Sequence, residues 1–223
     1  MFFKINVYPS SLLIIFVVIL QFTFLTVSTG ASAAAESYLL WNSERSDDRS
    51  AFYKWNSMET RYIDQQKVPD SKCDKVRFHP CEIIHWKAMI QSLKDKPFFE
   101  QLRIINKYAN VYPYITDPEN WGTADYWETP FEFLELSGNC KDYAITKYYS
   151  LRMLGIPAER LRLIILQDLN LGGVIHAILG VYKDGELYIL DNQIQQVIPA
   201  RKIYHYKPIY AINETSWWRY IPE

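Results

Sequence analysis

Three residues of this 223-residue sequence carry the side chains needed for nucleophilic acyl transfer: Cys140, His176 and Asp191. A thiol attacks a carbonyl carbon after it loses its proton, an imidazole can take that proton, and a carboxylate can orient the imidazole and stabilise its charged form. The chain supplies one residue for each role. The sequence therefore predicts cysteine-dependent acyl transfer if the fold brings the three side chains together.

Cys140 stands at the start of a predicted helix. Asn139 is a favoured N-cap residue, and Gly155 followed by Pro157 is typical of a helix end. A thiol in the first turn faces unpaired backbone N–H groups and the positive end of the helix dipole, which stabilise a thiolate. A buried structural cysteine would be inert instead. The predicted face of this helix consists of Cys140, Ala144, Tyr148 and Leu151.

A hairpin is predicted to bring His176 and Asp191 together. Asp184-Gly185 lies between two β-branched or aromatic runs and indicates a two-residue turn. This register places His176 opposite Gln193 and puts Asp191 diagonally from His176 on the same sheet face, within side-chain reach. Taken singly, His176 could be a core histidine and Asp191 a strand-end cap. The apolar residues expected on that face are Val174, Ile178, Leu187 and Ile189, so the two polar side chains would need each other as partners.

The other two cysteines, Cys73 and Cys81, enclose a short polar stretch with a proline. In an exported protein this spacing predicts a loop closed by a disulfide, which leaves Cys140 as the unpaired thiol. The alternative is a zinc site, although the spacing C-x5-H-x-C-x3-H is not that of a familiar zinc finger. The ligands of that alternative site would be Cys73, His79, Cys81 and His85.

The N-terminus has the order of a secretory signal peptide over residues 1–33: Lys4, an uncharged apolar run, and small residues ending in Ala31-Ser32-Ala33. Cleavage there would leave one domain, residues 34–223. An uncleaved membrane anchor is the alternative, because the apolar run approaches the length that spans a bilayer. Loss of Lys4 would move the formal charge from −1 to −2. This charge does not indicate nucleic acid or an anionic membrane as a partner.

Helices are predicted before strands. Residues 37–112 show apolar residues at helical spacing, and residues 116–139 predict an ordered loop whose Trp121 and Trp127 either form a cleft wall or seat the loop. This order predicts an α+β fold in which a helical N-terminal part packs with an antiparallel β-sheet. The runs predicted as strands are 161–166, 174–182, 186–191 and 207–213.

The stretch DYWETPFEFLELSGNCKDYAITKYYSLRMLGIPAERLRLIIL, followed by HAILGVY and LYILDNQIQQVIPA, resembles the bacterial transglutaminase-like cysteine proteinases. The resemblance runs from about Asn110 to the C-terminus. It implies a papain-like, transglutaminase-like core in which the cysteine opens a helix packed on an antiparallel sheet. By motif position, the resemblance implies a triad of Cys140, His176 and Asp191.

The residues beside the cysteine depart from the adhesin-processing members of that family, which have a G-D-C-E-D-Y pattern whose acids serve a calcium site. This sequence has Asn139 and Lys141 around Cys140. Asn139 can still offer a carbonyl oxygen, but Lys141 cannot ligate a hard cation and would repel it. We therefore expect no metal or other cofactor. One hypothesis is that Lys141 replaces the cation and favours the thiolate; the alternative is that it points into solvent.

Together these features predict a periplasmic cysteine endopeptidase that acts through an acyl-enzyme on an exported protein, such as a large surface adhesin. Transfer to an amine, as in transglutaminases, would use the same triad. A non-catalytic binding module on the same fold is the alternative from another class. The resemblance also implies, as a regulatory partner, an inner-membrane receptor that senses a cyclic dinucleotide.

Overall fold

The computed structural model describes residues 37–67 and 80–222. The predicted signal peptide, residues 1–33, lies outside the described residues. Cys73 and His79 also lie outside them, and so do the predicted disulfide and the alternative zinc site that depend on these residues. The described residues all fall within one unit, Ala34–Glu223. No helix in these two ranges is long and apolar enough to cross a membrane.

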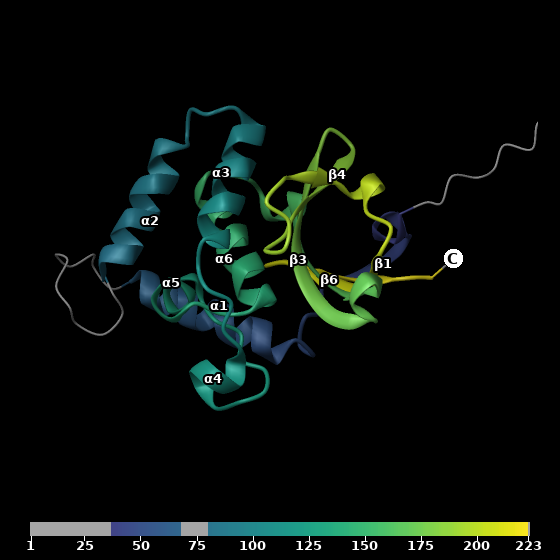
Figure 1. Ribbon diagram of the computed structural model, residues 1–223, viewed down its shortest axis with the longest axis horizontal. Coiled ribbons are helices and arrows are strands. Elements are labelled where there is room, and N and C mark those ends of the chain that lie inside the picture. The colour runs from purple at the N-terminus through teal and green to yellow at the C-terminus, as the bar shows by residue number, and fades with distance from the viewer. Residues whose placement is uncertain (1–36, 68–79, 223) are drawn as a thin grey trace, which may run out of the picture. The chain divides into compact units, whose positions relative to one another are not determined.

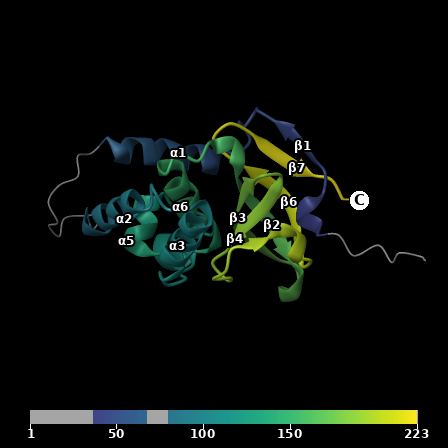
Figure 2. The same ribbon diagram turned by 90° about the horizontal axis from the view of Figure 1, so that it is seen from above.

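The helices gather on one side of the sheet, as both views of the ribbon show (Figures 1 and 2). Two of them, α4 and α5, lie in the stretch 116–139 that was predicted to be a loop, so that prediction is wrong. Each is opened by a Thr-x-x-Glu capping box with a proline in its first turn. The helices are α1 (Tyr53–Gln66), α2 (Pro80–Ser92), α3 (Phe98–Asn110), α4 (Asp117–Trp121), α5 (Pro130–Leu136) and α6 (Cys140–Met153).

A seven-stranded antiparallel sheet follows, in the order β1-β7-β6-β2-β3-β4-β5. The predicted α+β class is therefore confirmed. The polar edge strand β1 was not predicted, because the segment has no apolar alternation and is a strand only through its pairing with β7. The strands are β1 (Ser43–Ser46), β2 (Leu161–Asp168), β3 (Val174–Lys183), β4 (Glu186–Leu190), β5 (Ile198–Pro199), β6 (Tyr206–Ile212) and β7 (Trp217–Tyr220).

The predicted hairpin between β3 and β4 is confirmed. Asp184 and Gly185 both have positive φ, 51° and 80°, as a type I′ turn requires, and this turn matches the twist of the flanking strands. Lys183 pairs with Glu186 across it. The turn therefore fixes the register that carries His176 toward the end of β4.

Helix α6 lies between the other helices and the sheet, in contact with α3, α5, β2 and β3. Every side chain from Lys141 to Leu151 is buried, so the helix is covered on all sides and not only on the predicted face. Ile145 and Tyr148 pack in one core with Leu163 and Leu179 of the sheet. Because a central helix is held by its surroundings on every side, Cys140 at its first residue is fixed in position.

Candidate active site

Cys140 is the first residue of α6, as predicted, and its thiol is free and half-buried. The backbone around it is held by the Asp142 carboxylate. Oδ2 of Asp142 accepts a hydrogen bond from the Asn139 backbone N–H at 3.0 Å, which completes a capping box, and Oδ1 accepts one from the Glu128 N–H at 3.0 Å. One buried carboxylate thus joins the first turn of α6 to the segment that leads into α5.

His176 on β3 contacts Asp191, which follows β4. Nε2 of His176 lies 2.9 Å from Oδ1 of Asp191, and both side chains are buried. The ladder between the two strands ends at the pair Leu179 and Leu190. The predicted pairing of His176 with Gln193 is therefore absent, because the chain leaves the sheet at Asp191; the Gln193 N–H instead bonds Oδ1 of Asp191 at 2.9 Å.

The apolar surroundings of this pair are mostly as predicted. Ile178, Leu187 and Ile189 pack in one buried cluster with Tyr206, whose hydroxyl donates to Asp191. Val174 is the exception, since 57% of it is exposed. Val174 follows the turn after β2 at the start of β3, beyond the part of the strand that the cluster covers.

The electrostatics of the site favour a charged imidazole. Burial alone would lower the pKa of His176, but hydrogen bonds to Asp191 and Cys140, together with their negative charges, raise that pKa to about 9. Burial would raise the pKa of Asp191, but the hydrogen bond and charge of His176 hold it below its usual range. A pKa of about 9 favours the imidazolium form of His176 at neutral pH, in contact with the Asp191 carboxylate and with Cys140.

Two tyrosines that the sequence did not single out contact the predicted triad. The Tyr206 hydroxyl donates to Oδ2 of Asp191 at 2.6 Å. Tyr114, beside Gly138 in an isolated bridge, is hydrogen-bonded to Cys140: loss of water around its hydroxyl, and then the charge of Cys140, raises the pKa of Tyr114 to about 12. Neither tyrosine has a sequence signal of its own, because the contacts come from chain segments that meet only in the fold.

Lys141 does not point into solvent, so that alternative is wrong. Its side chain is 7% exposed and its ammonium lies among carboxylate and amide oxygens. Nζ is 2.8 and 2.9 Å from the two carboxylate oxygens of Asp117, 2.8 Å from Oδ1 of Asn139 and 3.2 Å from Oδ2 of Asp142. Asp117, which begins α4, was not predicted to lie near the cysteine.

Glu128 completes a buried acidic cluster beside Lys141. Burial, and then the charge of Asp142, raises the pKa of Glu128 to about 8. The Trp121 indole N–H donates to Oε1 of Glu128 at 2.6 Å, so this tryptophan, the last residue of α4, holds α4 against the segment that leads into α5. A Cβ on Gly138 would lie 2.7 Å from carboxylate oxygens of both Asp142 and Glu128, so only glycine fits between them.

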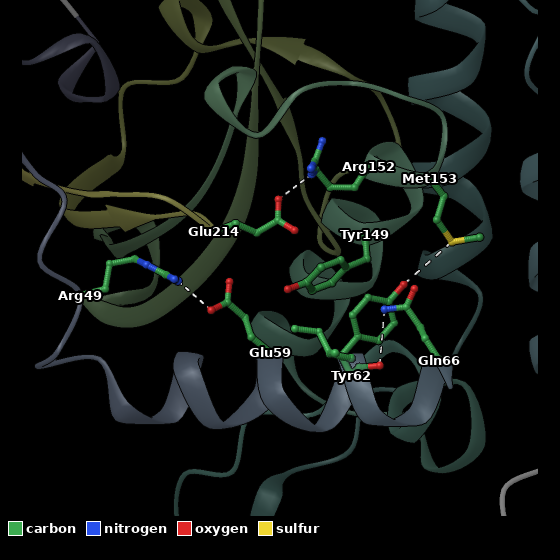
Figure 3. Close-up of a pocket in the computed structure, with 9 residues that line it drawn as sticks. Arg49, Glu59, Tyr62, Gln66, Tyr149, Arg152, Met153 and Glu214 are labelled. Carbon is green, nitrogen blue, oxygen red and sulfur yellow. Dashed lines mark hydrogen bonds and ion pairs between the residues drawn. The ribbon is translucent and has the colours of Figure 1, made fainter. Parts of the chain in front are cut away.

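Figure 3 shows a pocket of about 410 Å³ at the other end of α6. Its charged side chains are paired, Arg49 with Glu59 at 2.7 Å and Arg152 with Glu214 at 2.5 Å. Arg152 is separated from Cys140 by about 18 Å along the helix axis, at 1.5 Å per residue. The pocket is therefore distinct from the cluster around Cys140, and its lining holds no thiol or histidine.

Comparison with known proteins defines the class. Residues 70–223 match the family described as bacterial transglutaminase-like cysteine proteinase BTLCP. This chain belongs to that family and is a transglutaminase-like cysteine peptidase. No curated protein sequence is significantly similar to it.

Solved structures of Legionella pneumophila LapG are similar to the chain over most of their length. The calcium-bound form is 29% identical, with a TM-score of 0.58, and the match covers 74% of this chain and 86% of that one. A second LapG structure is 30% identical with a TM-score of 0.57, covering 73% and 87%. The EGTA-treated form is 30% identical with a TM-score of 0.58, covering 74% and 86%.

Proposed function

We propose that this peptidase is an exported endopeptidase that cleaves a protein substrate with Cys140 as nucleophile, His176 as proton carrier and Asp191 as orienting carboxylate. The observation that carries the proposal is the 2.9 Å contact between Nε2 of His176 and Asp191, on an imidazole that also bonds the Cys140 thiol. Because Asp191 engages Nε2, proton exchange with the thiol runs through Nδ1.

The proposed reaction has two halves. The Cys140 thiolate forms a bond to the substrate carbonyl carbon, and the His176 imidazolium gives its proton to the leaving amine as the C–N bond breaks. Neutral His176 then takes a proton from water, which attacks the thioester and releases Cys140. The buried Asp191 carboxylate holds the imidazole in one orientation and stabilises its positive charge throughout.

Export is supported by the sequence of residues 1–33, which has the charged start, apolar run and small-residue end of a signal peptide. The proteins available to an exported peptidase are surface proteins and other exported proteins. With the family resemblance, this supports a large surface adhesin as the substrate class, and an inner-membrane cyclic-dinucleotide receptor as the regulator.

Calcium does not fit the residues beside Cys140 in this chain, although one LapG structure is calcium-bound. Calcium takes about six to eight oxygen ligands at roughly 2.3–2.6 Å. Here the oxygens of Asp117, Asn139 and Asp142 converge on the Lys141 ammonium at hydrogen-bond distances. Across residues 37–67 and 80–222, no group of three or more His, Cys, Asp or Glu side chains is arranged to hold a metal ion.

The proposal is tested with a library of peptides from a proteome digest, incubated with the wild type and with Cys140→Ala. New N-termini that depend on Cys140 would support hydrolysis, whereas cross-linked peptides with an isopeptide mass would indicate transfer to an amine. If the wild type yields neither product and Cys140 reacts with iodoacetamide no faster than a free thiol, the chain is a binding module. Equal thermal unfolding of the two proteins establishes that Cys140→Ala is folded.

A further inference from the structure

Lys141 is buried, and a buried ammonium destabilises the fold unless acceptors and negative charges surround it. An ammonium has three N–H donors, and four oxygens from three residues surround it at 2.8–3.2 Å. These residues belong to two elements, since Asp117 begins α4, whereas Asn139 caps α6 and Asp142 lies in its first turn. The ammonium therefore connects α4 to the start of the helix that carries Cys140.

The acidic groups around Lys141 need a cation. Burial raises the pKa of Asp142 to about 6, and the positive charge of Lys141 opposes that rise. Lys141 likewise opposes the rise in the pKa of Glu128. Carboxylates buried this close repel one another, and removing the positive charge would leave them uncompensated.

The segment held by Lys141 leads directly to the thiol. Asp117 follows Tyr114 and Ile115, and the Ile115 N–H donates to the Gly138 carbonyl at 2.9 Å. Tyr114 in turn is hydrogen-bonded to Cys140. Fixing Asp117 against α6 therefore fixes the residues that contact Cys140 from the side of α4.

We infer that the Lys141 ammonium is a built-in cation that holds Asp117 against the first turn of α6 and so positions Cys140 without a bound metal. Lys141 is a positioning residue, because the contacts of its ammonium are to the acidic cluster. Its effect on catalysis rests on the proposed function, but its effect on the fold and on Cys140 reactivity does not.

The first test needs no variant. Thermal unfolding and the rate of Cys140 alkylation by iodoacetamide, followed by mass spectrometry of the Cys140 peptide, are measured with calcium chloride and with EGTA. Both should be the same in the two conditions. A wild type that calcium stabilises, or whose Cys140 reacts differently in EGTA, would overturn the inference whether or not the protein cleaves peptides.

The second test removes or inverts the charge. Lys141→Met should lower the unfolding midpoint by about 10 °C and slow alkylation about tenfold, because the acidic cluster loses its cation. Exposed Lys94→Met is the matched control and should change neither. The double variant N139D/K141E should be less stable in EGTA and regain its midpoint with calcium.

Two outcomes of the second test contradict the inference. One is a Lys141→Met protein that matches Lys94→Met in both measurements, since the ammonium would then position nothing. The other is an N139D/K141E protein that unfolds at the same temperature with calcium and with EGTA, since Lys141 would then not stand in a cation position. If Lys141→Met does not fold, the inference is still tested by the wild type in calcium chloride and in EGTA and by the double variant N139D/K141E.

Discussion

The Tyr206 hydroxyl lies 2.6 Å from Oδ2 of Asp191, the carboxylate oxygen that His176 does not use. Oδ1 accepts from Nε2 of His176 and from the Gln193 N–H, both at 2.9 Å. Both oxygens of a buried carboxylate are thus engaged, by a strand residue, a loop N–H and a tyrosine from β6. Such a carboxylate has little freedom to rotate, so it can hold the imidazole in one orientation.

Removing that hydroxyl should weaken catalysis without removing the triad. Tyr206→Phe leaves the ring in place but deprives Oδ2 of its donor, so we expect kcat/KM to fall about tenfold, or about 1.4 kcal/mol. Tyr204→Phe is the control, since Tyr204 is exposed, and its kinetics should match the wild type. Equal activity of the two variants would show that the Tyr206 contact does not support Asp191.

The charge of Asp191 should set the alkaline limit of activity. In the proposed mechanism the imidazolium of His176 protonates the leaving amine, so kcat/KM should fall as pH rises through about 9, the pKa of His176. Asp191→Asn removes the negative charge while burial still disfavours imidazolium. The pKa of His176 should then drop by roughly 1–3 units, and activity at neutral pH by about 10²–10⁴-fold.

The measurement is the pH profile of kcat/KM for both proteins over about pH 5–10. The descending limb of Asp191→Asn should lie at lower pH than that of the wild type. Coincident limbs would mean that the raised pKa of His176 does not depend on Asp191. Thermal unfolding at each pH separates loss of chemistry from loss of fold.

The buried ammonium of Lys147 should lower the free energy of unfolding. It is fully buried in α6 with no hydrogen-bond partner for Nζ among the described residues. Burial lowers its pKa from 10.5 to about 7, although the Asp191 charge opposes the shift. Between those two pH values the unfolded chain binds more protons than the folded one. Stability therefore rises with pH across that window, and the cost is full below pH 7.

Lys147→Met should accordingly stabilise the fold, by on the order of 3 kcal/mol at pH 6 and by much less at pH 10. Urea unfolding at the two pH values measures the difference, with Lys94→Met as the exposed control. A Lys147→Met protein that is less stable than the wild type at pH 6 would mean that the charged lysine is matched by Asp191 and contributes to the fold.

Local patterns predicted the elements that position the site. Asn139 and Gly155 correctly predicted the two ends of α6. Asp184-Gly185 correctly predicted the turn that fixes the β3–β4 register. The capping boxes of α4 and α5 are also local patterns, but loop-forming residues surround them and mask the helix signal. Local chemistry thus decided where helices and turns begin.

Contacts between distant segments could not be predicted in the same way. Asp117 meets Lys141 and Tyr206 meets Asp191 because the fold brings α4 to α6 and β6 to the end of β4. The polar strand β1 likewise depends on β7. Without a local pattern, such pairs appear only once the packing of the whole domain is known.

Peptide cleavage by the wild type, Cys140→Ala, His176→Ala and the double variant tests the central claim most directly. If the thiol and imidazole act as one unit, each single substitution should lower kcat/KM by at least about 10³-fold, and the double variant should be no slower than the slower single variant. Cleavage retained by folded Cys140→Ala, or losses that multiply in the double variant, would contradict the account.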